Sequence, residues 1–182
     1  NIQKKAMKRI LALGASTSST SINKQLAHYT AHQIEDADLT LIDLNDFTAP
    51  LFSTDLETSD GIPEAAQRFK ECVESMDGII VSLAEHNGNY AAAFKNLMDW
   101  VSRMEGKIWS DKKMFLMATS PGGRGGKSVH EIASAAFPRF GAEITASFML
   151  PSFYDNFSKE GIADSDLAKS LKEELKQFVA SL

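Results

Sequence analysis

Cysteine is almost absent from this chain, because Cys72 is the only one among 182 residues. A single cysteine excludes an internal disulfide, a thiolate zinc cluster and a Cys-x-x-Cys redox pair. The simplest interpretation of Cys72 is a small, buried helix residue. The sequence also lacks the run of about 18 apolar residues that a membrane-spanning helix needs, and its start shows no apolar segment of the secretory type. We therefore expect a cytoplasmic protein that does not enter a membrane.

Positive charge is also scarce, since 19 Lys and Arg residues stand against 24 Asp and Glu residues, for a net charge of -5. Proteins that bind a nucleic-acid backbone usually carry a basic face, so we do not expect nucleic acid as a partner. Repeats, low-complexity tracts and an evident linker are missing as well, and the length suits one hydrophobic core. We expect a single domain over residues 1–182, with residues 1–7 flexible or extraneous to the fold.

Apolar runs of strand length alternate with helical periodicity along the chain. The patterns predict strands over residues 10–13, 39–44, 78–83, 113–119 and 143–150. They predict helices over residues 22–34, 63–76, 90–104, 129–137 and 167–178. Such alternation predicts parallel strands joined by right-handed crossovers, with helices on both faces of the sheet. Ligands of doubly wound sheets bind beyond the carboxyl ends of the strands, so the loops after the first, third and fourth strands are the candidate site.

The loop after the first predicted strand is rich in hydroxyl groups, with Ser or Thr at every position from 16 to 20. It leads into a helix whose first N–H groups and positive dipole end would stabilise a phosphate without a metal. Ser and Thr also cap helices, and the loop alone does not separate the two roles.

The loop after the third predicted strand reads Ala84-Glu85-His86-Asn87-Gly88-Asn89-Tyr90. Gly88 would let the backbone approach a flat ring, and Asn87 would offer hydrogen bonds to the polar edge of that ring. His86 would pack near the ring and titrate close to neutral pH, or it would be an exposed loop residue.

The loop after the fourth predicted strand reads Ser120-Pro121-Gly122-Gly123-Arg124-Gly125-Gly126-Lys127-Ser128. It is not an ATP-binding P-loop, because Pro121 stands where that motif requires glycine. Its four glycines would allow positive φ and a close approach to a ligand. Arg124 is a candidate for contact with the phosphates of a nicotinamide nucleotide, or it is a solvated surface charge.

The hydroxyl-rich loop resembles the phosphate motif of the NAD(P)H-dependent FMN reductase family, Gly-Ser-x-Arg-x-x-Ser-x-Asn. Ser16, Ser21 and Asn23 match the motif, whereas Ala15 and Ser18 replace its Gly and Arg. Arg binds a phosphate through a planar fork that Ser cannot reproduce. Loss of a charged hydrogen bond of about 1.5 to 3 kcal/mol would weaken FMN binding roughly ten- to a hundredfold, unless hydroxyl groups or Lys24 compensate.

The second loop and the helix after it resemble the same family's Pro-Glu-Tyr-Asn-Gly-Ser-Tyr and Lys-Asn-x-x-Asp-Trp segments. The matching residues are Glu85, Asn87, Gly88, Tyr90, Lys95, Asn96, Asp99 and Trp100. Ala84 and His86 replace the family's Pro and Tyr. The resemblance suggests that Lys95, Asn96 and Trp100 fix the loop or a subunit contact rather than touch substrate.

The resemblance implies a flavodoxin-like three-layer α/β sandwich, with a five-stranded parallel sheet in the order 2-1-3-4-5 and helices on both faces. It implies an FMN-dependent oxidoreductase that takes electrons from NADPH or NADH. The implied acceptors are small molecules such as a quinone, an azo compound, a metal oxyanion or free flavin. It also implies a homodimer or tetramer, paired through the helix after the second loop and the segment near Trp109.

The cofactor contacts implied by the resemblance involve fourteen residues: Ser16, Ser18, Ser21, Ile22, Asn23, Glu85, His86, Asn87, Gly88, Ser120, Pro121, Gly122, Gly123 and Gly125. No catalytic side chain is expected, because the flavin carries the chemistry. The segment Phe153 to Ile162 resembles a family loop that would rim the site. Two alternatives fit the same residues: a flavin-binding electron carrier or regulatory module without nicotinamide activity, and a scaffold that has abandoned FMN.

A metal site is not expected. His28 and His32 stand four residues apart on a predicted helix, which is the spacing of a two-histidine metal site. No third ligand is evident in the sequence, so we interpret both histidines as solvated helix residues.

Overall fold

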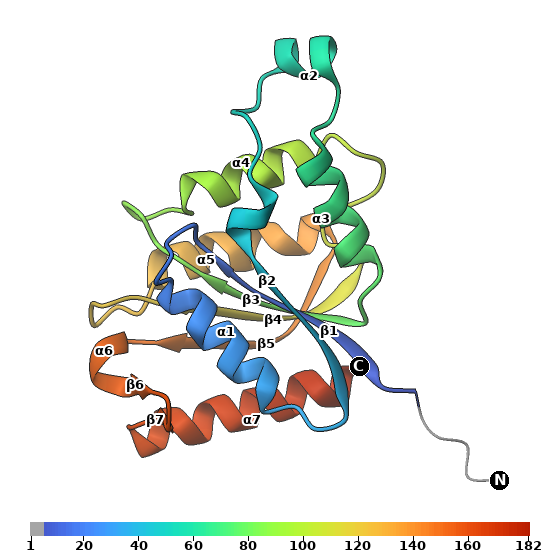
Figure 1. Ribbon diagram of the computed structural model, residues 1–182. Coiled ribbons are helices and arrows are strands. Elements are labelled where there is room, and N and C mark those ends of the chain that lie inside the picture. Colours follow the sequence, from blue (N-terminus) through green and yellow to red (C-terminus); the bar gives the residue numbers. More distant parts are fainter. Residues whose placement is uncertain (1–5) are drawn as a thin grey trace, which may run out of the picture.

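Five parallel strands form the sheet of this protein, seen in a computed structural model that describes residues 6–182 (Figure 1). The strands are β1 (Lys8–Ala15), β2 (Ala37–Asp43), β3 (Gly78–Leu83), β4 (Lys112–Thr119) and β5 (Ala142–Leu150). Their order is β2-β1-β3-β4-β5, which confirms the predicted flavodoxin-like sandwich. We expected residues 1–7 to be flexible or extraneous to the fold. Residues 1–5 of this segment lie outside the described part of the chain.

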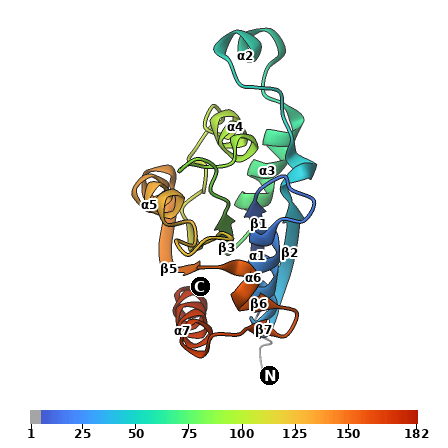
Figure 2. The same cartoon turned by 90° about the vertical axis from the view of Figure 1, so that its left-hand side faces the viewer.

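Helices cover both faces of the sheet (Figures 1 and 2). One face is covered by α1 (Ile22–His32) and α7 (Ser165–Ser181), and the other by α3 (Glu64–Glu74), α4 (Ala92–Val101) and α5 (Lys127–Ala136). Successive strand residues point to opposite faces, so β1 contributes Leu11 and Leu13 to one core and Ile10 and Ala12 to the other. This double burial explains why β1 and β3 are continuous apolar runs in the sequence.

Six short elements were not predicted from the sequence, so the expectation of five helices was incomplete. They are η1 (Leu44–Phe47), α2 (Thr54–Asp60), η2 (Phe137–Phe140), α6 (Phe153–Asn156), β6 (Phe157–Ser158) and β7 (Gly161–Ile162). None of the residues of α2 is buried, so this helix has no apolar periodicity to reveal it. Both β6 and β7 are two-residue strands, too short to leave a pattern.

The arm, residues 48–63, carries α2 away from the sheet and its covering helices (Figures 1 and 2). Its base is fastened to α4, where the side chains of Asn96 and Trp100 both donate hydrogen bonds to the carbonyl oxygen of Pro50, at 3.0 and 2.7 Å. Phe52 packs edge-on against Trp100 at 5.0 Å between ring centroids. Asn96 and Trp100 therefore fix the arm rather than the second loop, which was one of the two roles expected of them; the other, a subunit contact, stays a prediction.

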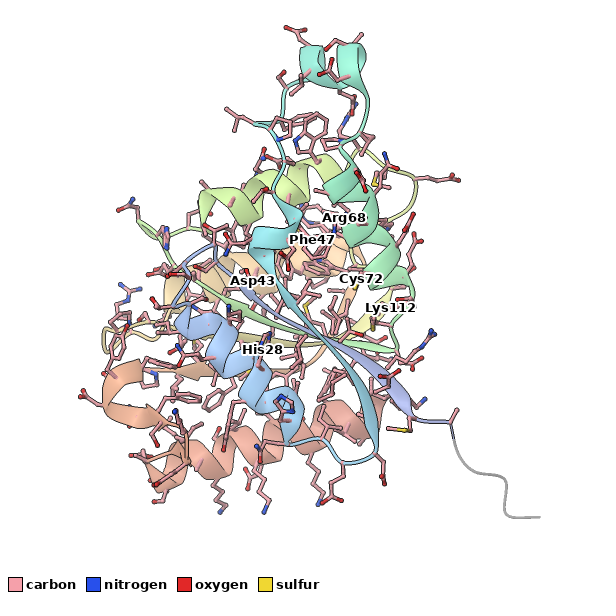
Figure 3. The ribbon with its side chains drawn as sticks, in the orientation of Figure 1. His28, Asp43, Phe47, Arg68, Cys72 and Lys112 are labelled. Atoms are coloured by element: carbon pink, nitrogen blue, oxygen red, sulfur yellow. The ribbon has the colours of Figure 1, made fainter. Side chains whose placement is uncertain are left out.

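Cys72 and His28 differ from their predicted environments. Cys72 lies on α3 and is half-buried rather than buried (Figure 3), and burial raises the pKa of its thiol. His28 is half-buried on α1, with Nε2 3.3 Å from the carbonyl oxygen of Ile42 in β2, so it is not a solvated residue. Within residues 6–182, no cluster of three or more His, Cys, Asp or Glu side chains is arranged to hold a metal ion.

The face covered by α3 is closed at its β2 edge by η1. Phe47 of η1 packs edge-on against Phe69 of α3, at 5.7 Å between ring centroids, and the guanidinium of Arg68 lies over the Phe47 ring at 4.9 Å (Figure 3). Across the described part of the chain, no helix combines the length and the apolar character needed to cross a bilayer.

Candidate functional site

A cavity of about 180 Å³ opens at the carboxyl ends of β1, β3 and β4. It lies where the strand order reverses between β1 and β3, the position at which doubly wound sheets bind ligands. Its walls come from the three loops that follow these strands and from α6. The lining residues are Ser16, Ser18, Thr20, Ser21, Ile22, Asn23, Ala84, Glu85, His86, Thr119, Ser120, Pro121 and Tyr154.

Nine of the fourteen residues predicted from the sequence line this cavity: Ser16, Ser18, Ser21, Ile22, Asn23, Glu85, His86, Ser120 and Pro121. The other five, Asn87, Gly88, Gly122, Gly123 and Gly125, belong to the same loops but are not part of its lining. Four lining residues were not among those predicted: Thr20, Ala84, Thr119 and Tyr154. Tyr154 belongs to the segment expected to rim the site, and Thr119 could have been found as the last residue of its strand.

The first loop presents hydroxyl groups whose protons can face a ligand. Ser16 Oγ accepts a hydrogen bond from the N–H of Ser18 at 3.1 Å, and Ser18 Oγ accepts one from the N–H of Thr20 at 3.3 Å. A hydroxyl that accepts from the backbone still has its own proton to donate. Ser21 caps α1, because its Oγ accepts from the N–H of Lys24 at 3.0 Å. Ser21 therefore caps the helix and, like Ser16 and Ser18, keeps a hydroxyl proton that can face the cavity.

Gly14 allows α1 to begin directly against β1. A Cβ atom at Gly14 would lie 2.2 Å from the backbone nitrogen of Lys24 and 2.7 Å from the backbone carbon of Asn23, so no other residue fits there without moving the helix. The first N–H groups of a helix have no acceptor within it. Gly14 therefore brings the free N–H groups of Ile22 and Asn23 to the end of the strand.

Asn23 ties this helix start to the sheet. Its Oδ1 accepts hydrogen bonds from the N–H of Thr119 at 3.1 Å and from Ser82 Oγ at 2.7 Å, and its Nδ2 donates to the carbonyl oxygen of Thr119 at 3.2 Å. The residue is 2% exposed. Since β3 and β4 occupy both acceptor positions of the side chain, Asn23 positions the cavity wall and offers mainly its backbone N–H to a ligand.

The second loop is shaped by a tight turn. Asn87 and Gly88 have φ of 53° and 77°, and His86 and Asn89 exchange two backbone hydrogen bonds at 2.8 and 3.1 Å. This is the Asn-Gly pattern of a two-residue hairpin turn. It places His86 at the cavity, while Asn87 and Gly88 form the tip of the turn.

Glu85 joins the second loop to the third. Its Oε1 accepts a hydrogen bond at 2.8 Å from the N–H of Val129, in the first turn of α5. The N-cap position of α5 is Gly126, which has no side chain to cap the helix. Glu85 supplies this cap from a distant part of the chain, and a carboxylate is favourable at a helix N-terminus.

The third loop is held against α6 through its backbone. The carbonyl oxygen of Gly122 accepts from the N–H of Ser152 at 2.9 Å, and that of Ser120 accepts from the N–H of Phe153 at 3.0 Å. Gly125 has a φ of 61°, and a Cβ there would lie 3.0 Å from the backbone nitrogen of Pro151. Gly125 thus serves close packing of two backbone segments.

The four glycines of this loop differ in conformation. Positive φ, which all four were expected to allow, is found at Gly125 and Gly126, but not at Gly122 or Gly123. A Cβ atom at Gly123 would meet nothing within 4 Å.

Cationic side chains are missing from the cavity wall. Of its thirteen lining residues, all within the described chain, none is Lys or Arg, and Glu85 is the one carboxylate. Lys24 was named with the hydroxyl groups as a possible substitute for the missing Arg, and its Nζ lies 2.9 Å from Asp43 Oδ2. This hydrogen bond lowers the pKa of the Asp43 carboxyl. Arg124 is exposed and donates to Ser128 Oγ at 3.0 Å, as expected of a surface charge.

Known proteins that are similar to this chain include two characterised by sequence and one by its structure. An NADPH:quinone oxidoreductase of Arabidopsis thaliana is 28% identical over 185 residues, covering 98% of this chain and 91% of that protein. An NAD(P)H-dependent FMN reductase of Pseudomonas aeruginosa is 32% identical over 82 residues, covering 44% of each. The structure of FerB, a flavoenzyme NAD(P)H:(acceptor) oxidoreductase from Paracoccus denitrificans, covers 96% of both chains with a TM-score of 0.76 and 23% identity, which supports the fold.

The family model named NADPH-dependent FMN reductase matches residues 8–177, from the first residue of β1 into α7. The match includes all three loops of the cavity and the residues by which the sequence resembles this family. The chain belongs to the NADPH-dependent FMN reductase family.

Proposed function

We propose that the cavity at the ends of β1, β3 and β4 holds FMN, and that the chain uses it to transfer electrons from NADPH or NADH to a small acceptor. The observation that carries this proposal is the meeting of three loops at one cavity beside the start of α1. A helix start offers N–H groups and a positive dipole end to an anion. The family supports FMN as the anion in question.

The donor set of the first loop fits a phosphate group. The N–H groups of Ile22 and Asn23 and the hydroxyl groups of Ser16, Ser18 and Thr20 would bind it. All of these are hydrogen-bond donors, and none competes with the phosphate as a second anion. The phosphate end of FMN therefore belongs at the start of α1.

The flavin ring would lie between the second and third loops. His86 and Tyr154 offer flat faces at the opening, and Tyr154 is 72% exposed. The cavity of about 180 Å³ is smaller than the roughly 300 to 1,000 Å³ typical of pockets that enclose a ligand. Part of the ring would thus remain outside, where a nicotinamide and an acceptor could reach it in turn. Asn87, Gly88, Gly122, Gly123 and Gly125 stay predicted contacts of the ring.

The residues around the cavity would bind FMN and hold it in a fixed orientation. FMN held by these loops would supply the redox chemistry, taking hydride from the nicotinamide and passing the electrons to the acceptor. The chain holds the reacting partners in a productive arrangement, which by itself accounts for a large part of the acceleration in such reactions. Quinones are the first acceptors to test, because the Arabidopsis relative is named for them.

The test is oxidation of NADPH and NADH by the purified protein supplied with FMN and a quinone. Ser120 lines the cavity, so Ser120→Trp would place a large side chain inside it. This variant should lose both FMN binding and the activity. Ser170→Trp, at an exposed position of α7, is the matched control and should retain both. Absence of nicotinamide oxidation with every quinone would contradict the proposal.

We also infer a homodimer and a cytoplasmic location. A second cavity, of about 360 Å³, lies between α4 and α5, and its apolar lining includes Tyr90, Met98, Ile108, Ile132, Phe137 and Phe140. The resemblance implies pairing through the same region, since α4 is the helix that follows the second loop. Of these residues Phe140 is exposed, at 39%, and an apolar hollow that is open to solvent suits a subunit contact. The cytoplasm is one compartment that contains the proposed nicotinamide donors.

A further inference from the structure

We propose that this site discriminates only weakly between FMN and riboflavin, because Ser18 leaves the 5′-phosphate without a cationic partner. The inference rests on the proposed FMN site and concerns which flavins the site accepts. It makes the position of Ser18 the determinant of phosphate specificity in this chain.

Among the described residues, no positively charged side chain lines the cavity. Its lining contains no Lys or Arg, and it contains the carboxylate of Glu85. A phosphate dianion in this cavity meets hydrogen-bond donors but no opposite charge among the lining residues, and the exposed Ser18 and Thr20 leave it in contact with water. The phosphate consequently contributes less affinity than it would with a cationic partner.

The nearby cations do not supply the missing charge. Lys24 follows Asn23 on α1, but Asp43 binds its Nζ at 2.9 Å. Asp43 is itself fixed by the N–H of Asn45, at 2.9 Å from Oδ1. Neither Arg124 nor Lys127 of the third loop is part of the cavity lining, and both are exposed.

The neutral donors that remain are partly engaged with one another. Ser18 Oγ and Thr20 Oγ1 lie 3.4 Å apart, so one of these hydroxyl protons can serve the other oxygen instead of a ligand. A hydroxyl or N–H donor brings no positive charge of its own, whereas an Arg would add an opposite charge and a bidentate fork, so neutral donors do not replace an Arg.

Ser18 lies within reach of the ligand, whereas its neighbour Ser19 does not. Both residues are exposed and belong to the same loop, but only Ser18 lines the cavity. The two positions therefore form a matched pair. An Arg at 18 restores a charged fork at the cavity, and an Arg at 19 adds the same charge to the loop without reaching the site.

The experiment is a titration of the apoprotein with FMN and, separately, with riboflavin, in which quenching of flavin fluorescence gives the two dissociation constants. We expect the unaltered protein to prefer FMN by less than about a hundredfold, as neutral hydrogen bonds and a helix dipole would allow. Ser18→Arg should tighten FMN roughly ten- to a hundredfold and leave riboflavin unchanged. Ser19→Arg should change neither. Added salt should weaken FMN binding mainly in Ser18→Arg.

The outcomes separate this inference from the proposed function. A preference for FMN above about a thousandfold in the unaltered protein would overturn the inference alone, since it would require phosphate contacts as strong as charged ones. An unchanged ratio of the two dissociation constants in Ser18→Arg would also overturn it alone. Binding of neither flavin to the unaltered protein would overturn the proposed site, and the inference with it.

Discussion

At the scale of single residues, Asn23 is the polar side chain on which the geometry of the cavity depends most. It is buried and bonded to both Ser82 and Thr119. Asn23→Ala should lower the free energy of unfolding by about 3 kcal/mol, because buried partners are left without hydrogen bonds. Urea denaturation followed by circular dichroism measures this change. Gln33→Ala, at an exposed position, is the control and should stay within about 0.5 kcal/mol. Equal stability of the two variants would contradict the role given to Asn23.

Two glycines test whether close packing or backbone conformation matters more. Gly14→Ala should cost about 3 kcal/mol or more, because the new Cβ would lie 2.2 Å from a backbone nitrogen of α1. Gly88→Ala places a Cβ where nothing lies within 4 Å, at a φ of 77°, so only strain of about 1 kcal/mol is expected. Thermal unfolding of both variants compares the two effects. Greater loss of stability in Gly88→Ala would show that α1 does not rest on β1 as described.

At the scale of elements, His130 gives the contact between α5 and β5 a pH dependence. Its Nε2 lies 2.6 Å from Ser147 Oγ, and burial lowers the pKa of the imidazole. The unfolded chain therefore binds a proton at a higher pH than the folded one does. Stability should be complete above about pH 6.5 and should fall as the pH drops below that value toward the pKa of the folded state.

His130→Gln removes this titration. The slope of unfolding free energy against pH, measured by urea denaturation between about pH 5 and 7, should become less steep in the variant. His32→Gln is the control, because His32 lies at the exposed end of α1. A slope reduced equally by both variants, or by neither, would contradict the assignment to His130.

The elements that could be predicted are those with a periodic apolar face. Every strand of the main sheet and each of its five covering helices was found, because each has a periodic apolar face; even β2, which has no fully buried residue, packs Leu39 and Ile42 against the two cores. The helix α2 was missed because Leu56 is its one apolar residue, which leaves no periodic face to detect. The short strands β6 and β7 are held by contacts with other elements. Phe157 of β6, for example, packs edge-on against Tyr29 of α1, at 5.4 Å between ring centroids.

The candidate site was also predictable only in part. The loops were predictable because parallel strands end at one edge of a sheet. The hydrogen bonds that individual side chains make within the site could not be predicted. The spacing in the sequence does not show that Asn23 is bonded to Thr119, 96 residues away, or that Lys24 is held by Asp43. Tyr154 reaches the cavity because α6 is tied to the third loop through Phe153 and Ser120.

At the scale of the whole molecule, the proposed homodimer can be broken at one position. Phe140 is 39% exposed and lines the apolar cavity between α4 and α5. Phe140→Glu should shift the mass in solution from a multiple of 19.9 kDa toward the single chain, because a buried unpaired charge opposes association. Light scattering after size-exclusion chromatography measures this mass. Val179→Glu, at a residue 40% exposed on α7, is the matched control. A monomeric unaltered protein would contradict the dimer.

The most direct measurement of the central claim is a crystal structure of the protein grown with FMN. We expect the phosphate within hydrogen-bonding distance of the N–H groups of Ile22 and Asn23, and the flavin ring between the turn at Asn87 and the loop beginning at Ser120. A flavin bound elsewhere on the molecule, or these two loops closed against each other with no space for the ring, would contradict the account.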